Sequence, residues 1–97
     1  MPELQVIARY TLAPANEDEV LALLPQLAEA SRAEPGNVSF VAYRRLDDDR
    51  EIVLLERYAS RDAFAAHRES THFNDLVLGR IAPRLESRVV ETFDVVE

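Results

Sequence analysis

Alternating hydrophobic and polar positions mark four segments of the chain. Residues 4–12 (LQVIARYTL) alternate and are rich in β-branched and aromatic side chains, which predicts a strand. Residues 37–46 and 51–59 have the same character, and the short polar connection between them, residues 47–50, predicts that they form a hairpin. Residues 87–97 predict a fourth strand.

Helical periodicity follows the first predicted strand. Its apolar positions recur every three or four residues, at Val20, Leu23, Leu24 and Leu27. Asn16 followed by Glu19 matches a capping box, so we expect these residues to begin the helix. The helix should end at Glu34-Pro35-Gly36, because proline disfavours the helical conformation in the residue before it.

A second helical region follows the hairpin and divides into two pieces. Ser60 is in position to cap the first piece and Ser70 to cap the second. The order β-α-β-β-α-β, with a divided second helix, predicts an α+β, ferredoxin-like fold in which one antiparallel sheet carries helices on one face. The length of 97 residues is that of one domain, so we expect residues 1–97 to form a single domain.

Both faces of the predicted sheet are apolar. In the third strand, Leu54 and Tyr58 point to one side, while Val53 and Leu55 point to the other. An antiparallel sheet usually leaves one face in water, and the helices of this chain can cover only one face. We therefore expect an identical sheet to cover the second face in a homodimer. A monomer with an exposed apolar face is the alternative.

The charge and amino-acid composition of the chain limit the classes of partner that it can bind. The net charge is −7, and the 11 basic residues are scattered arginines. Binding of a polyanion needs clustered cations, so we expect no nucleic-acid partner. The absence of cysteine excludes disulfides, thiolate nucleophiles and cysteine-ligated metals. No apolar run is long enough for a membrane span and no signal peptide is recognisable, so we expect a cytoplasmic protein without a membrane partner.

Glu56 is the first candidate for chemistry, because it shares a strand face with Leu54 and Tyr58. A carboxylate that is removed from water and has no cationic partner has a raised pKa, and such a group can act as a general base. An ion pair with Arg9, Arg45 or an arginine of a partner chain is an equally good interpretation of the same position.

The chain has two histidines, His67 and His72. His67 lies three residues after Phe64, on the same helix face, where an imidazole can exchange a proton near neutral pH. A structural histidine bonded to a backbone carbonyl is the alternative. His72 follows the Ser70 cap, so we expect it at the rim of a cavity. A spacing of five residues across a helix break differs from that of helical metal pairs, so we expect no metal site.

The segments EPGNVSFVAYRR (34–45) and EIVLLERYASRDAFAAHRESTHF (51–73) resemble the antibiotic biosynthesis monooxygenase superfamily, in particular its small quinol-monooxygenase-like members. The family pattern has E-P-G after the first helix and E-x-Y or E-x-W at the end of the third strand. It continues with A-F/L-x-x-H and S/T-x-H-F in the second helical region. All four motifs occur here in this order, and the resemblance covers essentially the whole chain.

This resemblance implies that two subunits pair as a dimeric α+β barrel, with a pocket between sheet and helices in each subunit. It also implies a monooxygenase that oxidises a quinol-like or polyphenolic aromatic substrate with O2 and without flavin, haem, metal or another cofactor. His67 and Glu56 would supply the base. The residues that orient or enclose the substrate would be Asn37, Tyr43, Phe64, His72 and Phe73.

The chain departs from two branches of this family. It has no tryptophan, and His67 and Val77 stand where the haem-degrading branch has its tryptophan and haem-ligating histidine, so haem degradation is not expected. Anthrone oxygenases also use a tryptophan that is absent here. Two other functions stay open: an isomerase of a small keto or sugar-derived compound, which needs a base but no oxygen, and a non-catalytic ligand-binding dimer.

Overall fold

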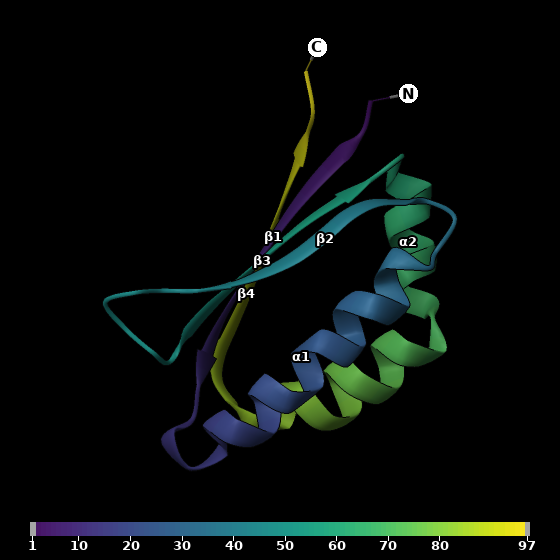
Figure 1. Ribbon diagram of the computed structural model, residues 1–97. Coiled ribbons are helices and arrows are strands. Elements are labelled where there is room, and N and C mark those ends of the chain that lie inside the picture. Colours follow the sequence, from purple (N-terminus) through teal and green to yellow (C-terminus); the bar gives the residue numbers. More distant parts are fainter. Residues whose placement is uncertain (1, 97) are drawn as a thin grey trace.

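A computed structural model describes residues 2–96 of the chain (Figure 1). Four strands form one antiparallel sheet in the order β2-β3-β1-β4. The strands are β1 (Leu4–Leu12), β2 (Asn37–Arg44), β3 (Glu51–Tyr58) and β4 (Leu85–Asp94). The helices are α1 (Glu17–Arg32), α2 (Arg61–Glu69), the π-helical segment η2 (Phe73–Ile81), and the 3-10 turns η1 (Pro14–Asn16) and η3 (Ala82–Arg84). This element order confirms the predicted α+β, ferredoxin-like fold.

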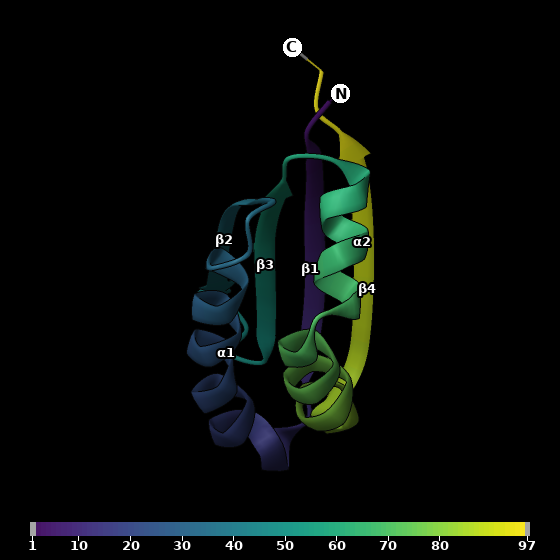
Figure 2. The same cartoon turned by 90° about the vertical axis from the view of Figure 1, so that its right-hand side faces the viewer.

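All helices lie on one face of the sheet (Figure 2). The register pairs Leu4 with Tyr58 and Val6 with Glu56, so the even-numbered residues of β1 and β3 share the face that the helices cover. Leu12, Val20 and Ile81 are fully buried in the core between the two layers. The predicted alternation therefore sets which side chains reach the space between sheet and helices.

The opposite face of the sheet is free of helices and partly apolar. Its exposed apolar side chains are Val41, Tyr43, Leu55, Val89 and Phe93. Arg9 and Glu91 form an ion pair of 2.9 Å on the same face. The prediction that both faces carry apolar side chains is confirmed, whereas the partner that would cover this one stays a prediction.

The second helical region is divided as predicted. Ser60 caps α2 by accepting a hydrogen bond from the backbone N–H of Ala63 at 3.1 Å. The chain turns out of the helix at Ser70, whose backbone is extended, and the Ser70 Oγ accepts from the N–H of Phe73 at 3.2 Å. This break lets the next residues turn back toward α2, so that side chains on both sides of it can meet.

The predicted capping box at the start of α1 is wrong. Asn16 makes no side-chain hydrogen bond at this position. It is the last residue of η1, and its own N–H is bonded to the carbonyl of Ala13 at 2.9 Å. Glu19 forms an ion pair with Arg84 instead of turning back to the helix start. Contact with η3 has thus replaced the local cap.

Within residues 2–96, no helix combines the length and the apolar character that crossing a membrane requires.

Candidate active site

A cavity of about 270 Å³ lies between the sheet and the helical layer. Side chains from all four strands and from α1, α2 and η2 form its wall. The apolar part of the wall consists of Val6, Ala8, Leu27, Phe40, Leu54, Phe64, Phe73, Val77 and Val90. A dry cavity of about 150 Å³ can hold benzene, so this one has room for a compound of one or two rings.

Glu56 brings a buried carboxyl group to this apolar wall. It lies on β3 between Val6 and Phe40 of the neighbouring strands, and its residue surface is 4% exposed. The Tyr58 hydroxyl donates to Glu56 Oε1 at 2.6 Å. Burial raises the pKa of Glu56 to about 7, although the hydrogen bond from Tyr58 acts in the opposite direction. A carboxyl group of this kind exchanges its proton near neutral pH.

His67 brings an imidazole to the same wall from α2. It is buried, and four aromatic rings surround it at centroid distances of 5.2 to 6.1 Å: Phe40, Tyr58, Phe64 and Phe73. Its Nε2 lies 3.8 Å from Glu56 Oε1. Burial lowers the pKa of His67 below its usual 6.5, while the neighbouring Glu34 carboxylate opposes this effect. The ring is therefore neutral at pH 7 and able to accept a proton.

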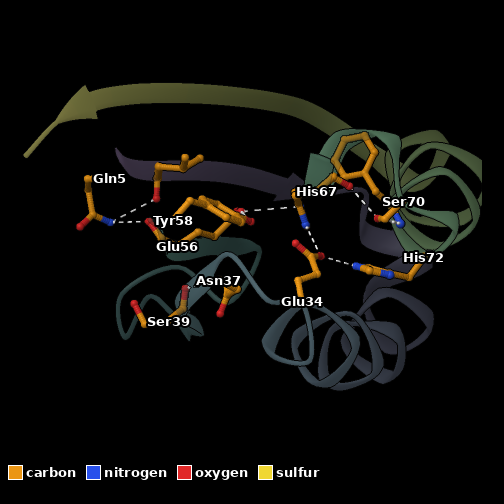
Figure 3. A network of polar contacts seen from close by, with 11 residues as sticks. Gln5, Glu34, Asn37, Ser39, Glu56, Tyr58, His67, Ser70 and His72 are labelled. Atoms are coloured by element: carbon orange, nitrogen blue, oxygen red, sulfur yellow. Dashed lines mark hydrogen bonds and ion pairs between the residues drawn. The ribbon is translucent and has the colours of Figure 1, made fainter. Parts of the chain in front are cut away.

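A third ionisable group, Glu34, connects the two histidines. It lies in the loop between α1 and β2, and Figure 3 shows its carboxylate between the two imidazole rings. Glu34 Oε2 lies 2.7 Å from His67 Nδ1 and 2.5 Å from His72 Nε2. His72 is 21% exposed at its side chain, so this group reaches from the buried cavity wall to the protein surface.

The same three side chains are the candidates for holding a metal ion among the described residues. Their nearest donor atoms all lie within 4.8 Å of one another. Two ligands of one ion, each about 2.1 Å from it, are about 3 Å or more apart. The distances of 2.7 and 2.5 Å from Glu34 to the two nitrogens are shorter than this and match hydrogen bonds.

A cationic group lies further along the cavity. Tyr10 of β1 pairs with Arg88 of β4. Tyr10 lies four residues after Val6, which is the residue of β1 that pairs with Glu56. Burial raises the pKa of Tyr10 to about 12, and the charge of Arg88 partly offsets this. The Arg88 guanidinium lies 5.8 Å from the centre of the Phe73 ring. The cavity therefore has an acid–base end and an end that offers hydrogen-bond donors to an anion.

Four of the residues predicted from the sequence meet at this cavity. Glu56, His67, Phe64 and Phe73 all line it. The ion pair of Glu56 with Arg9 or Arg45 is wrong, since these arginines pair with Glu91 and Asp47 and the Glu56 carboxylate is bonded to the Tyr58 hydroxyl. An ion pair with an arginine of a partner chain stays a prediction.

The other three predicted residues lie outside the cavity wall. Tyr43 faces the helix-free side of the sheet and is 52% exposed, because it is an odd number of positions from the inward-facing Phe40. Asn37 pairs with Tyr58 at the start of β2, and its amide donates to the Ser39 carbonyl at 3.1 Å. His72 contacts Glu34 behind the ring of His67 instead of facing the cavity.

Sequence reasoning did not find Glu34, Tyr10 or Arg88 as site residues. Glu34 was noted only as part of the E-P-G motif. Tyr10 carried a signal, since it shares the inward face of β1 with Val6. Arg88 carried none, because an arginine on an edge strand is ordinarily a solvated side chain.

Comparison with known proteins identifies relatives of the whole chain. The family model described as antibiotic biosynthesis monooxygenase matches residues 4–77. Rv0793 of Mycobacterium tuberculosis, provisionally named a monooxygenase, is 41% identical over 68 residues, which are 70% of this chain and 66% of that protein. YcnE of Bacillus subtilis, also provisionally named a monooxygenase, is 30% identical over 64 residues, which are 66% of this chain and 67% of that protein. The chain thus matches about two thirds of the length of each relative.

Solved structures agree with these sequence matches. The structure of Rv0793 superposes with a TM-score of 0.90 and 31% identity, covering 98% of this chain and 96% of that one. A structure from Caulobacter crescentus, whose title assigns it provisionally as an antibiotic biosynthesis monooxygenase, gives a TM-score of 0.90 and 26% identity. It covers 99% of this chain and 92% of the other.

Proposed function

Because the chain belongs to the antibiotic biosynthesis monooxygenase family, we propose that it is a monooxygenase that oxidises a quinol-like or polyphenolic substrate with O2 and needs no cofactor. One observation carries this proposal. A buried carboxyl group, Glu56, and a buried neutral imidazole, His67, meet at the wall of an apolar cavity of about 270 Å³.

This combination suits a substrate that becomes reactive by losing a proton. A phenol that gives its proton to His67 or Glu56 becomes an electron-rich anion, which can transfer an electron to O2 directly. The resulting radical pair combines through a new C–O bond to a hydroperoxide. Loss of water then breaks the O–O bond and leaves a carbonyl group. One oxygen atom enters the product, the other leaves as water, and the substrate supplies both electrons and both hydrogens of that water.

The remaining wall has parts suited to this chemistry. Phe64 and Phe73 can enclose an aromatic ring. Arg88, beside Tyr10, can stabilise the oxyanion at the end of the cavity away from Glu56. A substrate with oxygen substituents at both ends of a ring would meet the base with one of them and the cation with the other.

Oxygen uptake tests the proposal. Menadiol or a polyphenol is added to the protein in an oxygen electrode, and the autoxidation rate without protein is subtracted. We expect His67→Ala to lower kcat by about 10²- to 10⁴-fold, the usual contribution of a general base. The matched control is Glu69→Gln, because Glu69 lies on the same helix and is exposed. Uptake that is equal to autoxidation, or that is indifferent to His67→Ala, would overturn the proposal. A proton shift seen by NMR without oxygen uptake would instead identify an isomerase.

We also propose that a second copy of the chain covers the helix-free face of the sheet. Val89 and Phe93 on β4 and Tyr43 on β2 are about half exposed on the two edge strands of this face, and an identical face offers the same apolar side chains in return. Light scattering should find a dimer at micromolar concentration, and Phe93→Glu should shift it to a monomer. Leu78→Glu, which changes an equally exposed leucine on η2, is the control. A wild-type monomer would contradict this assembly.

A further inference from the structure

We propose that Glu34 is the positioning residue of the site. Its carboxylate fixes the rings of His67 and His72 in opposite tautomers, so that the unprotonated Nε2 of His67 is presented to the cavity. The effect on rate rests on the proposed function, since a base matters only if the substrate gives up a proton there. The tautomers themselves do not rest on it.

The atoms in contact determine these tautomers. An ionised carboxylate has acceptor sites only, so every ring nitrogen that is hydrogen-bonded to it must carry a proton. Glu34 Oε2 accepts from Nδ1 of His67 at 2.7 Å and from Nε2 of His72 at 2.5 Å. A neutral imidazole carries one ring proton. His67 is therefore protonated at Nδ1 and bare at Nε2, whereas His72 is protonated at Nε2.

The bare nitrogen of His67 points toward the chemistry. Its Nε2 lies 3.8 Å from Glu56 Oε1, which is beyond hydrogen-bond distance, and within residues 2–96 it has no hydrogen-bond partner. The ring itself lines the cavity beside Glu56. A substrate hydroxyl that enters this space meets one nitrogen ready to accept its proton and one carboxyl group next to it.

Glu34 is held in place by its own loop. Its N–H donates to the Ser31 carbonyl at 3.1 Å, and its carbonyl accepts from the N–H of Asn37 at 3.1 Å. Two residues further on, Gly36 packs against α2 so closely that a Cβ there would lie 2.5 Å from the Cβ of Ala63. Ala63 precedes His67 by one helical turn and shares its face. The loop that carries Glu34 therefore packs directly against α2, the helix that carries His67, and this contact holds the carboxylate beside the imidazole.

The arrangement stabilises the product of proton transfer as well. When His67 takes a proton on Nε2, the ring becomes a cation that is still bonded to Glu34. The other charged or titratable groups near this ring are Glu56 and Tyr58 of β3, Arg68 of α2 and His72. Arg68 and His72 disfavour an imidazolium at His67, whereas the Glu34 carboxylate favours it and so offsets them.

NMR of the full chain tests the tautomers without any turnover. Histidine-selective ¹⁵N and ¹³C labelling at pH 8 yields two ring systems, which His72→Gln assigns. We expect His67 in the Nδ1–H form and His72 in the Nε2–H form in the wild-type protein. Glu34→Ala should return His67 to a mixture dominated by the Nε2–H form, and Glu69→Ala, on an exposed glutamate of α2, should leave it unchanged. An Nε2–H form of His67 in the wild-type protein overturns the proposal, even if Glu34→Ala does not fold.

The rate and a metal titration complete the test. In the oxygen assay, Glu34→Ala should lower kcat by about 10²-fold or more with little change in KM, and Glu34→Asp should restore part of it. A full rate in Glu34→Ala with normal oxygen uptake by the wild type overturns the positioning role but leaves the monooxygenase proposal intact. Titration of EDTA-treated protein with Zn²⁺ should give no stoichiometric binding at micromolar concentration. Uptake of one ion per chain, with loss of the bonded ring protons, would show a metal site in place of the hydrogen-bonded unit.

Discussion

Replacement of Glu56 by glutamine should stabilise the folded chain at alkaline pH and change its stability little near pH 4. Glutamine has nearly the same shape as glutamate, and its carbonyl can still accept the hydrogen bond that the Tyr58 hydroxyl now donates at 2.6 Å. The substitution removes only the ionisation. Since burial is what raises the pKa of Glu56, the wild-type chain must either hold a proton at this position or bury a charge.

The size of the effect follows from the pKa in the folded and unfolded chain. The pKa of Glu56 is about 7 in the folded chain against an ordinary value of 4.5. Between these values the folded chain binds more protons than the unfolded one, so the free energy of unfolding falls as pH rises. At about 1.4 kcal/mol per pH unit, the loss is complete above pH 7 and amounts to about 3 kcal/mol. Glu56→Gln should therefore exceed the wild type by up to about 3 kcal/mol at pH 8.

Urea unfolding followed by circular dichroism measures this difference. Wild type and Glu56→Gln are compared at pH 4.5, 6 and 8 at one subunit concentration, so that any association contributes equally to both. With an m-value of about 1–3 kcal/mol/M, the midpoint at pH 8 should rise by roughly 1–3 M. Glu69→Gln, which removes an exposed carboxylate of α2, is the matched control. A difference for Glu56→Gln that is equal at pH 4.5 and pH 8 would refute the reasoning.

Three further predictions concern the groups around Glu56. Gly36→Ala should destabilise the chain by about 1–3 kcal/mol in urea unfolding, because the new Cβ would lie 2.5 Å from that of Ala63; an unchanged midpoint would mean that α2 moves away freely. Tyr58→Phe removes the hydroxyl that favours the ionised carboxylate, so the acidic limb of the pH profile of kcat/KM should move to higher pH; a limb that stays in place would exclude Glu56 as its origin. Burial lowers the pKa of His67, so NMR titration should find that it gains its second ring proton below pH 6.5, and a titration above pH 6.5 would contradict this. The stability that His67 contributes is accordingly present above pH 6.5 and is lost as the pH falls.

The fold could be predicted because its determinants are local. Period-two alternation in residues 51–59 put Leu54, Glu56 and Tyr58 on one face of β3, and all three are buried on the same face in the structure. The serine at each helix start marked α2 and the break after it. Asn16 is the counterexample. Asn16 followed by Glu19 matches the sequence pattern of a capping box. In the structure, however, Glu19 forms an ion pair with Arg84, and Asn16 makes no capping hydrogen bond. Short-range rules failed where a contact from a distant segment supplied the partner.

The site could be predicted only in part for the same reason. Glu56 stood out as one carboxyl group on an apolar strand face, and His67 as a polar group beside Phe64. Glu34 lies 33 residues before His67, and nothing local indicates that the two meet. The spacing of the two histidines did argue against a helical metal pair. It could not reveal that a carboxylate from another loop would join them.

Tyr43 shows the limit of a resemblance between sequences. The resemblance implied that Tyr43 contacts the substrate, yet strand geometry decides which aromatic side chain of β2 reaches the cavity. Phe40 points inward, and a residue three positions later must point to the other face. The side chain of Tyr43 is accordingly half exposed there, among the apolar residues that we assign to the subunit interface.

The two faces of β3 explain how the chain can keep an unfavourable acid. Glu56 lowers stability by about 3 kcal/mol above pH 7, and its neighbour Leu55 lies on the opposite face, 37% exposed. Complete burial of one leucine or phenylalanine side chain contributes about 1.5–3 kcal/mol. Each apolar side chain of the helix-free face is only partly exposed, so covering one of them contributes less than this amount of free energy. Covering several of them together can contribute more than the roughly 3 kcal/mol that the buried carboxylate costs. In the proposed dimer, β3 would hold Glu56 on one face and contact the second copy with the other, so the chain could keep this acid near neutral pH without unfolding.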